Sequence, residues 1–152
     1  MKVYRLYRQC YINASLEQVW DFFSYAGNLK LLTPAYMNIK ITSGNLPDKA
    51  FAGQIISYTL SPVAGISLSW ITEITDVLPN KLFVDEQRRG PYKLWHHEHH
   101  FEEQKGKVLM TDIVLYSMPF SFIGTIARFL FIKRQLDNIF DYRQRQIETI
   151  FK

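Results

Sequence analysis

Residues 37–117 contain six segments with β-strand patterns, each ended by a tight-turn signal, and this series leaves few folds open to the chain. Short runs rich in Val, Ile, Tyr, Phe and Thr stop at clusters of Gly, Pro, Asn or Ser, which is typical of antiparallel strands joined by short hairpins. The predicted strands are Met37–Thr42, Gly53–Leu60, Ser67–Val77, Lys81–Arg88, Tyr92–Glu103 and Lys107–Ser117. The sequence therefore predicts an antiparallel meander.

The segments on either side of this series complete the predicted fold. Val3–Ile12 predicts a first strand, Ser15–Gln18 has the capping-box pattern that begins a short helix, and Asn28–Leu32 predicts a second short helix. The remainder changes to a helical period, and its apolar stripe consists of Leu136, Ile139, Phe140, Arg143, Ile147 and Ile150. We expect one α+β domain over residues 1–152, with a curved antiparallel sheet wrapped around the C-terminal helix.

Two hairpin turns determine which residues of the last three predicted strands face each other. In the hairpin that turns at residues 104–106, the expected pairs are Trp95–Tyr116, His97–Val114, His99–Asp112 and Phe101–Met110. In the hairpin that turns at Gly90, the expected pairs are Phe83–His97 and Asp85–Trp95. A shift of two residues would change these partners but would leave every side chain on the same face.

The alternation of side chains along a strand sorts these residues onto two faces of the sheet. One face carries Phe83, Asp85, Gln87, Trp95, His97, His99, Phe101, Met110, Asp112, Val114 and Tyr116. His96 and His100 lie on the other face, which we expect to meet solvent. Buried polar groups need partners, so the polar residues of the first face either pair with one another, as His99 with Asp112, or line a cavity.

The motifs on this face resemble those of a known family. They are Phe83-x-Asp85-x-Gln87, Gly90-Pro91-Tyr92, Trp95-x-His97-x-His99-x-Phe101 and Met110-x-Asp112-x-Val114-x-Tyr116. They are similar to those of the bacterial SRPBCC ligand-binding proteins, which belong to the START-like superfamily with the birch-pollen allergen and the polyketide cyclases. The resemblance covers nearly the whole chain. It implies a helix-grip fold, in which seven strands surround the C-terminal helix and an apolar cavity lies between them.

The charge of the chain and its cysteine content indicate which classes of partner and which cellular compartment to expect. The net charge is +4, and much of the excess lies in Arg128, Lys133, Arg134, Arg143, Arg145 and Lys152. Acidic residues interrupt this series, so we expect a solvated helix face and no nucleic-acid binding. Cys10 is the single cysteine, and the first residues lack the apolar segment of a signal peptide, so we expect a cytoplasmic protein.

Metal binding is one hypothesis for the inward histidines. His97 and His99 share a face, and Asp112 would supply a third ligand of the kind that zinc accepts. The alternative is that both histidines are hydrogen-bonded to Asp112 and its neighbours. We favour this alternative and expect neither a metal nor another cofactor.

Acid–base catalysis is a second hypothesis, because a His–Asp pair in an apolar cavity provides a suitable environment for proton transfer. The groups concerned would be His97, His99, Asp112 and Asp85, in a reaction of the cyclase or dehydratase type that the resemblance suggests. Against catalysis, the sequence offers no evident nucleophile. We expect binding without catalysis.

The preferred hypothesis is therefore a site for a hydrophobic small molecule, lipid-like or aromatic, with one polar end. The aromatic share of 15% is compatible with such a cavity. The expected binding residues are Trp70, Phe83, Asp85, Gln87, Trp95, His97, His99, Phe101, Met110, Asp112, Tyr116, Phe140 and Ile147.

Two apolar segments are candidates for the mouth of the cavity. Ser61–Ile66 is more apolar than an ordinary turn, and Phe120–Ile123 and Phe129–Phe131 are apolar beside Arg128, Lys133 and Arg134. Apolar tips flanked by cations suit a transient contact with an anionic membrane surface. We favour instead a short helix packed on the rim or a contact between two copies, so the protein is expected to be a monomer or a homodimer.

Overall fold

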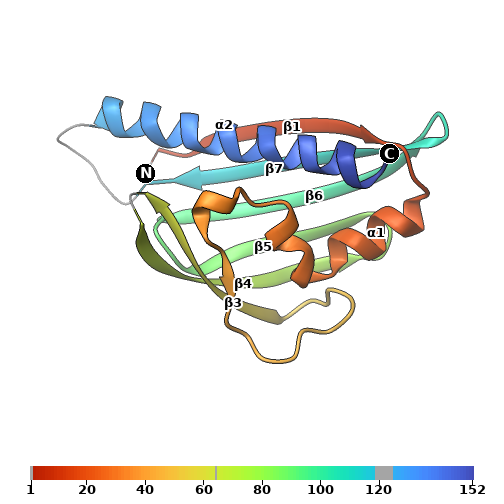
Figure 1. Cartoon of the computed structure of the whole chain (residues 1–152), viewed down its shortest axis with the longest axis horizontal. Helices are drawn as coiled ribbons and strands as arrows, with labels where there is room; N and C mark the ends of the chain where they lie inside the picture. Colours follow the sequence, from red (N-terminus) through yellow and green to blue (C-terminus); the bar gives the residue numbers. More distant parts are fainter. Residues whose placement is uncertain (1, 64, 119–124) are drawn as a thin grey trace.

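The computed structural model describes residues 2–63, 65–118 and 125–152 (Figure 1). Its strands are β1 (Tyr4–Ile12), β2 (Lys40–Ile41), β3 (Gln54–Val63), β4 (Ile66–Leu78), β5 (Leu82–Arg89), β6 (Leu94–Gln104) and β7 (Lys107–Ser117). The helical segments are α1 (Leu16–Ser24), the 3-10 helices η1 (Ala26–Leu31) and η2 (Ala35–Met37), and α2 (Thr125–Ile150).

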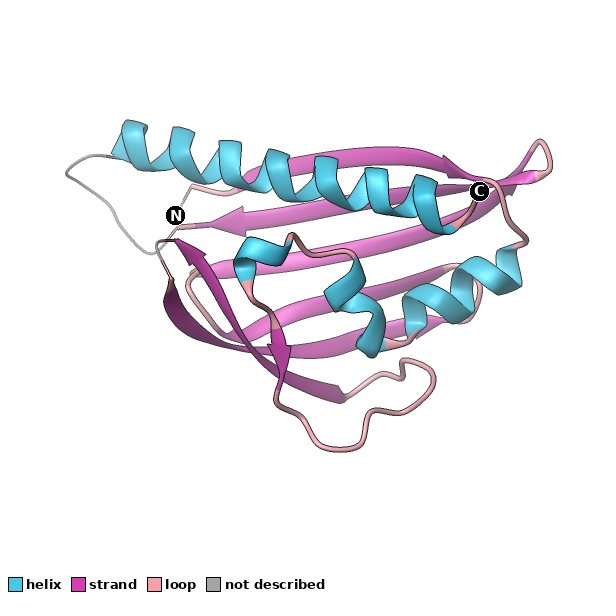
Figure 2. Ribbon diagram, in the orientation of Figure 1, coloured by secondary structure: helices cyan, strands magenta, loops and turns pink. Residues whose placement is uncertain are grey.

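The described strands form one antiparallel sheet of seven in the order β1-β7-β6-β5-β4-β3-β2. Figure 2 shows every helical segment on one face of this curved sheet. The helix α2 runs along the β1 side, where Arg8 of β1 donates a hydrogen bond to Asp137 of α2 at 2.6 Å. The predicted α+β helix-grip architecture is confirmed, and among the described residues no helix is long and apolar enough to cross a membrane.

Local sequence signals begin α1 as expected. Ser15 Oγ accepts a hydrogen bond from Gln18 N at 3.3 Å, and Ser15 N donates one to Gln18 Oε1 at 3.0 Å. These two bonds form the predicted capping box. The buried side of α1 places Trp20 edge-on against Phe83 and Phe101, with ring centroids 6.1 and 5.8 Å away. Burial of such rings holds α1 against one half of the sheet.

The region after α1 differs from the prediction. The expected second helix is the 3-10 helix η1, and the expected strand Met37–Thr42 is reduced to Lys40–Ile41. Met37 instead ends η2, and Asn38 takes a left-handed backbone conformation with φ 46°. A left-handed residue interrupts an extended strand, and Asn tolerates this conformation better than most side chains. The strand therefore begins only after Asn38.

The β6–β7 register matches the prediction, with Trp95 opposite Tyr116 and His99 opposite Asp112. The β5–β6 register is two residues away from the prediction, because Phe83 faces His99 and Asp85 faces His97. Gln87 explains the difference. Its side chain donates to Tyr92 O at 2.7 Å and accepts from Tyr92 N at 3.2 Å, so residues 90–93 form a wider loop than a turn at Gly90. The assignment of side chains to faces is unaffected.

Candidate functional site

A cavity of about 220 Å³ lies between the concave face of the sheet, α2 and the short helices. Its wall is mainly apolar and aromatic, and includes Phe83, Tyr92, Trp95, Leu136, Ile139 and Phe140. Trp70 and Trp95 meet edge to face with ring centroids 5.4 Å apart. Such rigid rings suit a flat apolar ligand.

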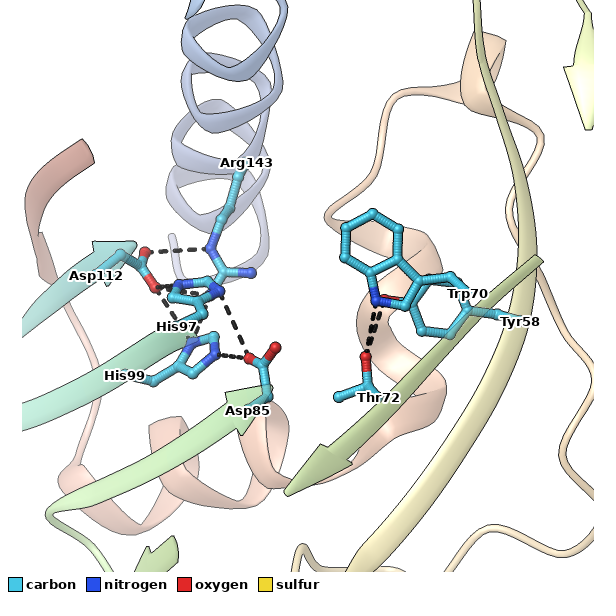
Figure 3. A network of polar contacts seen from close by, with 8 residues as sticks. All are labelled: Tyr58, Trp70, Thr72, Asp85, His97, His99, Asp112 and Arg143. Atoms are coloured by element: carbon cyan, nitrogen blue, oxygen red, sulfur yellow. Dashed lines mark hydrogen bonds and ion pairs between the residues drawn. The ribbon is translucent and has the colours of Figure 1, made fainter. Parts of the chain in front are cut away.

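Two histidines and two aspartates form a buried polar network on one side of this cavity (Figure 3). His97 Nε2 lies 2.9 Å from Asp112 Oδ1, and His99 Nε2 lies 2.6 Å from Asp85 Oδ2. His99 Nδ1 is also 3.2 Å from Asp112 Oδ1. The predicted contact between His99 and Asp112 is therefore present, but each histidine contacts both aspartates, since His97 Nδ1 lies 3.5 Å from Asp85 Oδ2.

Arg143 of α2 completes the network, contrary to its predicted place on a solvated helix face. Its Nε is 3.3 Å from Asp112 Oδ2, and its Nη2 is 3.3 Å from Asp112 Oδ1. Its guanidinium also lies over the ring of Phe23, 5.2 Å from the centroid. The signal was its place on the apolar stripe of the helix, where a basic residue is buried with its charge directed at a partner.

The charges of the network follow from these contacts. Burial opposes ionisation of Asp112, but the charge of Arg143 and the hydrogen bonds from His97 and His99 hold its pKa well below its usual range. Burial likewise opposes ionisation of Asp85, and the neighbouring His97 and His99 lower its pKa. Both aspartates are therefore carboxylates at neutral pH.

The two histidines are shifted in opposite directions. Burial lowers the pKa of His97, and the nearby charge of His99 lowers it further. Burial also disfavours the charged form of His99, but interactions with Asp112 and Asp85 outweigh it and raise its pKa. The ring nitrogens of His99 lie 2.6 and 3.2 Å from carboxylate oxygens, whereas His97 Nδ1 is 3.5 Å from Asp85, so His99 carries the proton and His97 stays neutral.

A second polar group of the cavity wall was not predicted. Trp70 Nε1 donates to Thr72 Oγ1 at 3.0 Å, and the hydroxyl of Tyr58 lies 3.2 Å from the same oxygen (Figure 3). Burial raises the pKa of Tyr58, so its hydroxyl stays neutral. Thr72 Oγ1 thus provides a hydrogen-bond partner for the Trp70 N–H and the Tyr58 hydroxyl, which would otherwise be buried without one.

The structure divides the expected binding residues into two sets. The residues at the cavity wall are Trp70, Phe83, Asp85, Trp95, His97, His99 and Phe140. The residues placed away from the wall are Gln87, Phe101, Met110, Asp112, Tyr116 and Ile147.

The second set corrects the prediction that one face lines one cavity. Phe101, Met110 and Ile147 belong to the core cluster that also holds Trp20 of α1, so α1 covers this half of the face. Tyr116 packs with other buried residues beneath α2. Asp112 lies behind the histidines, and Gln87 holds the loop before β6. The alternation of side chains along a strand assigns each residue to a face of the sheet. Only the positions of the helices decide which part of that face stays open to the cavity.

The outer histidines lie on the opposite face, as expected. His96 Nδ1 is 2.8 Å from Glu86 Oε1, and His100 Nε2 is 2.7 Å from Glu98 Oε2. The His96 and His100 side chains are 28% and 40% exposed. They are part of a partly solvated surface network and take no part in the cavity.

A metal-binding geometry is also present in part. Asp85, His97 and His99 offer ligand atoms within 4.8 Å of one another, with Asp85 in the position for which the sequence suggested Asp112. These atoms already contact protein partners, and Arg143 Nη2 lies 3.4 Å from His99 Nδ1. A guanidinium beside the ligands opposes a divalent cation. The donor set therefore fits a closed hydrogen-bond network better than a metal centre.

The two candidate mouth segments are described only in part. Phe120–Ile123 lies outside the described residues. Ile66 is 62% exposed, and Leu130 and Phe131 are 57% and 53% exposed. Gln135 of α2 donates to Pro62 O at 2.6 Å, which joins the β3–β4 hairpin to the helix. The exposed apolar residues of the hairpin and of α2 thus belong to segments that touch.

Comparisons with known proteins agree with this architecture. Residues 12–141 match the profile of the family described as polyketide cyclase / dehydrase and lipid transport. The structure of major latex-like protein 151 from Panax ginseng has a TM-score of 0.69 and 14% identity, over 99% of this chain and 98% of that one. Protein Ms6760 from Mycobacterium smegmatis has a TM-score of 0.68 and 15% identity, over 96% and 89%.

A larger protein contains a similar region. A nucleoside-diphosphate sugar epimerase from Corynebacterium glutamicum has a TM-score of 0.63 and 24% identity, over 93% of this chain but 28% of the epimerase. At these identities the structural likenesses establish the fold alone, and no curated protein sequence matches the chain. Because the family profile spans most of the sequence, the chain belongs to the polyketide cyclase/dehydrase and lipid transport (SRPBCC) family.

Proposed function

We propose that this protein binds a compact hydrophobic molecule carrying a polar group, in the cavity between the sheet and α2. The observation that carries the proposal is an aromatic cavity with a buried, charge-balanced polar network in its wall. Apolar walls supply most of the affinity in such sites, and a few placed polar groups orient the ligand.

The size of the cavity limits the types of ligand that it suits. Its volume of about 220 Å³ lies below the ~300–1,000 Å³ typical of pockets for drug-sized molecules. A molecule of one or two rings suits a cavity of this volume better than a long acyl chain does. Of the two ligand types that the sequence suggested, the aromatic one is therefore preferred over the lipid-like one.

Titration with 2-naphthol by isothermal calorimetry tests the proposal, with two matched variants of β3. Ile56 is 6% exposed at the cavity wall, and its neighbour Ile55 is 52% exposed on the other face. Ile56→Trp fills the cavity and should abolish binding, while Ile55→Trp should leave it unchanged. Absence of binding to the unmodified protein, or equal binding by both variants, would refute the proposal. Native mass spectrometry of the protein purified from its source would identify a retained ligand.

A cyclase or dehydratase reaction is a second candidate, favoured by the neutral His97 at the cavity wall. Asp112 orients its ring, so Nδ1 is available as a proton acceptor. Covalent catalysis by Cys10 has less support, because burial raises the pKa of its thiol to about 11. Asp112→Asn separates the two candidates. Loss of turnover with retained fold would indicate an enzyme, whereas weakened stability without any turnover in the unmodified protein would indicate a structural pair.

The remaining expectations stay part of this proposal. The partner is the small molecule, without nucleic acid, metal or cofactor, and the lone cysteine supports a reducing cytoplasm. The exposed Ile66, Leu130 and Phe131 support contact with a second copy or, transiently, with a membrane surface.

A further inference from the structure

Gln54, the first residue of β3, lines the cavity wall and has a buried amide donor without a partner among the described residues. It is 4% exposed and lines the wall. Its Oε1 accepts a hydrogen bond from Phe51 N at 3.4 Å, while Nε2 has no hydrogen-bond partner among the described residues. A buried amide donor without an acceptor destabilises a fold. This geometry suits a ligand that supplies the acceptor.

At the polar network, His97 and Asp85 offer hydrogen-bond acceptors, whereas Gln54 offers a donor. His97 Nε2 faces a carboxylate oxygen that only accepts, so this nitrogen carries the ring proton and Nδ1 is an acceptor. His97 Nδ1 lies 3.5 Å from Asp85 Oδ2, an oxygen that already accepts from His99. Two acceptors side by side at a cavity wall suit a hydroxyl or N–H group of the ligand.

The charges around this site are already balanced. The groups that meet here are the carboxylates of Asp85 on β5 and Asp112 on β7, the imidazoles of His97 and His99 on β6, and the guanidinium of Arg143 on α2. Two negative charges thus face the cations Arg143 and His99, and His97 is neutral. An anionic ligand would bury a charge without a partner, which is strongly unfavourable.

The sheet register places the Gln54 donor and the acceptors of His97 and Asp85 at opposite ends of an apolar strip. Gln54 pairs with Ile74, and Ile74 pairs with Asp85, so the three side chains lie in one row on the cavity face. Two strand spacings separate Gln54 and Asp85 by about 10 Å at the backbone. Ile74, which also lines the cavity, lies between them.

Building on the ligand-binding function proposed above, we propose that the ligand is an uncharged flat molecule with polar groups at both ends. A hydroxyl or N–H group donates to His97 Nδ1 and Asp85, and a carbonyl oxygen at the far end accepts from Gln54 Nε2. Gln54 is thus a specificity-determining residue.

The test compares four naphthalene probes by isothermal calorimetry. 6-Acetyl-2-naphthol has both groups at opposite ends, 2-naphthol has only the donor, 2-acetylnaphthalene has only the acceptor, and 6-hydroxy-2-naphthoate replaces the ketone with an anion. We expect 6-acetyl-2-naphthol to bind about three- to tenfold more tightly than either single-group probe, which is the effect of one net hydrogen bond. The naphthoate should bind more weakly than the ketone.

Gln54→Leu should remove the advantage of 6-acetyl-2-naphthol over 2-naphthol, and Gln54→Met serves as a second variant. A readout of stability excludes a merely structural role. Because Nε2 is unpaired and only the long hydrogen bond from Phe51 N at 3.4 Å is lost, Gln54→Leu should change the midpoint of thermal unfolding little. Gln87→Leu, which loses two hydrogen bonds to Tyr92, should lower it.

The outcomes distinguish this inference from the function on which it rests. If 2-naphthol fails to bind, the proposed function fails and this inference with it. If 2-naphthol binds but the ketone gives no advantage, only this inference is overturned. Tight binding of the naphthoate, or equal losses for both probes in Gln54→Leu, would also overturn it.

Discussion

Replacing Arg143 with methionine removes one cation from the buried network and leaves its partners in place. The Arg143 and Asp112 side chains are 10% and 7% exposed, with Nε 3.3 Å from Oδ2. Methionine keeps an unbranched apolar stem of similar reach, so the packing around the helix is largely retained. The change therefore tests how much the fold depends on a compensating charge beside Asp112.

The expected loss follows from the contacts that remain. Removing one partner of a buried ion pair typically costs about 3–5 kcal/mol, because the other charge stays buried. His97 still donates to Asp112 at 2.9 Å, so we expect the lower end, a decrease of about 3 kcal/mol in the free energy of unfolding. For a chain of 152 residues this corresponds to a drop in Tm of about 6–12 °C.

The pH dependence of this loss has a definite sign. The folded pKa of Asp112 lies below its unfolded value, so its stabilising contribution is present above about pH 4 and is lost as pH falls through the folded pKa. Arg143 is the first of the groups that lower this pKa. The difference between the unmodified protein and Arg143→Met should therefore be largest near neutral pH and shrink below about pH 4.

Urea unfolding at several pH values measures this effect. Arg145, exposed on the same helix, provides the matched control, and Arg145→Met should stay within about 0.5 kcal/mol of the unmodified protein. The double variant Arg143→Met/Asp112→Asn should lose at least about 1 kcal/mol less than the sum of its single variants, because the isolated charge is gone. A loss below about 1 kcal/mol for Arg143→Met, or one independent of pH, would refute the reasoning.

Three further predictions follow from other contacts. The unmodified protein should lose stability in acid below about pH 4 as Asp85 and Asp112 become protonated. In urea unfolding, Asp112→Asn should show a shallower decrease of the free energy of unfolding with falling pH. Parallel curves of this free energy against pH for the two proteins would contradict the prediction. Ser15→Ala should lower the free energy of unfolding by about 1 kcal/mol through loss of the capping box, while an unchanged value would show that the cap is dispensable. Equimolar zinc should leave the thermal unfolding midpoint unchanged, because Arg143 lies beside the candidate ligands; a clear rise that His99→Gln abolishes would establish a metal site.

Strand register illustrates how far local signals reach. The β6–β7 pairing was predictable because its turn is short and local, with Lys105 and Gly106 both at positive φ. The β5–β6 pairing was predicted two residues out of register, because Gln87 holds residues 90–93 in a wider loop through its own side chain. A turn formed by backbone conformation can be read from its residues. A loop held by a side chain five residues away is harder to foresee.

The cavity shows the same division. The alternation along the strand placed His97 and His99 inward and His96 and His100 outward, because successive side chains of a strand point to opposite faces. It could not separate Trp95, which lines the cavity, from Phe101, which α1 covers, because that depends on where α1 docks. Gln54 gave no signal in the sequence, since nothing local distinguishes a satisfied glutamine from an unsatisfied one.

The sequence by itself determined the order of strands and helices, the face of each strand residue and the family. These depend on side-chain period and turn chemistry, which act over a few residues. Only the tertiary structure decided which groups share the buried network. Asp112 and Arg143 lie 31 residues apart, on the sheet and on the helix packed against it. The charge of a buried histidine depends on such distant neighbours, because burial disfavours the charged form unless a partner stabilises it.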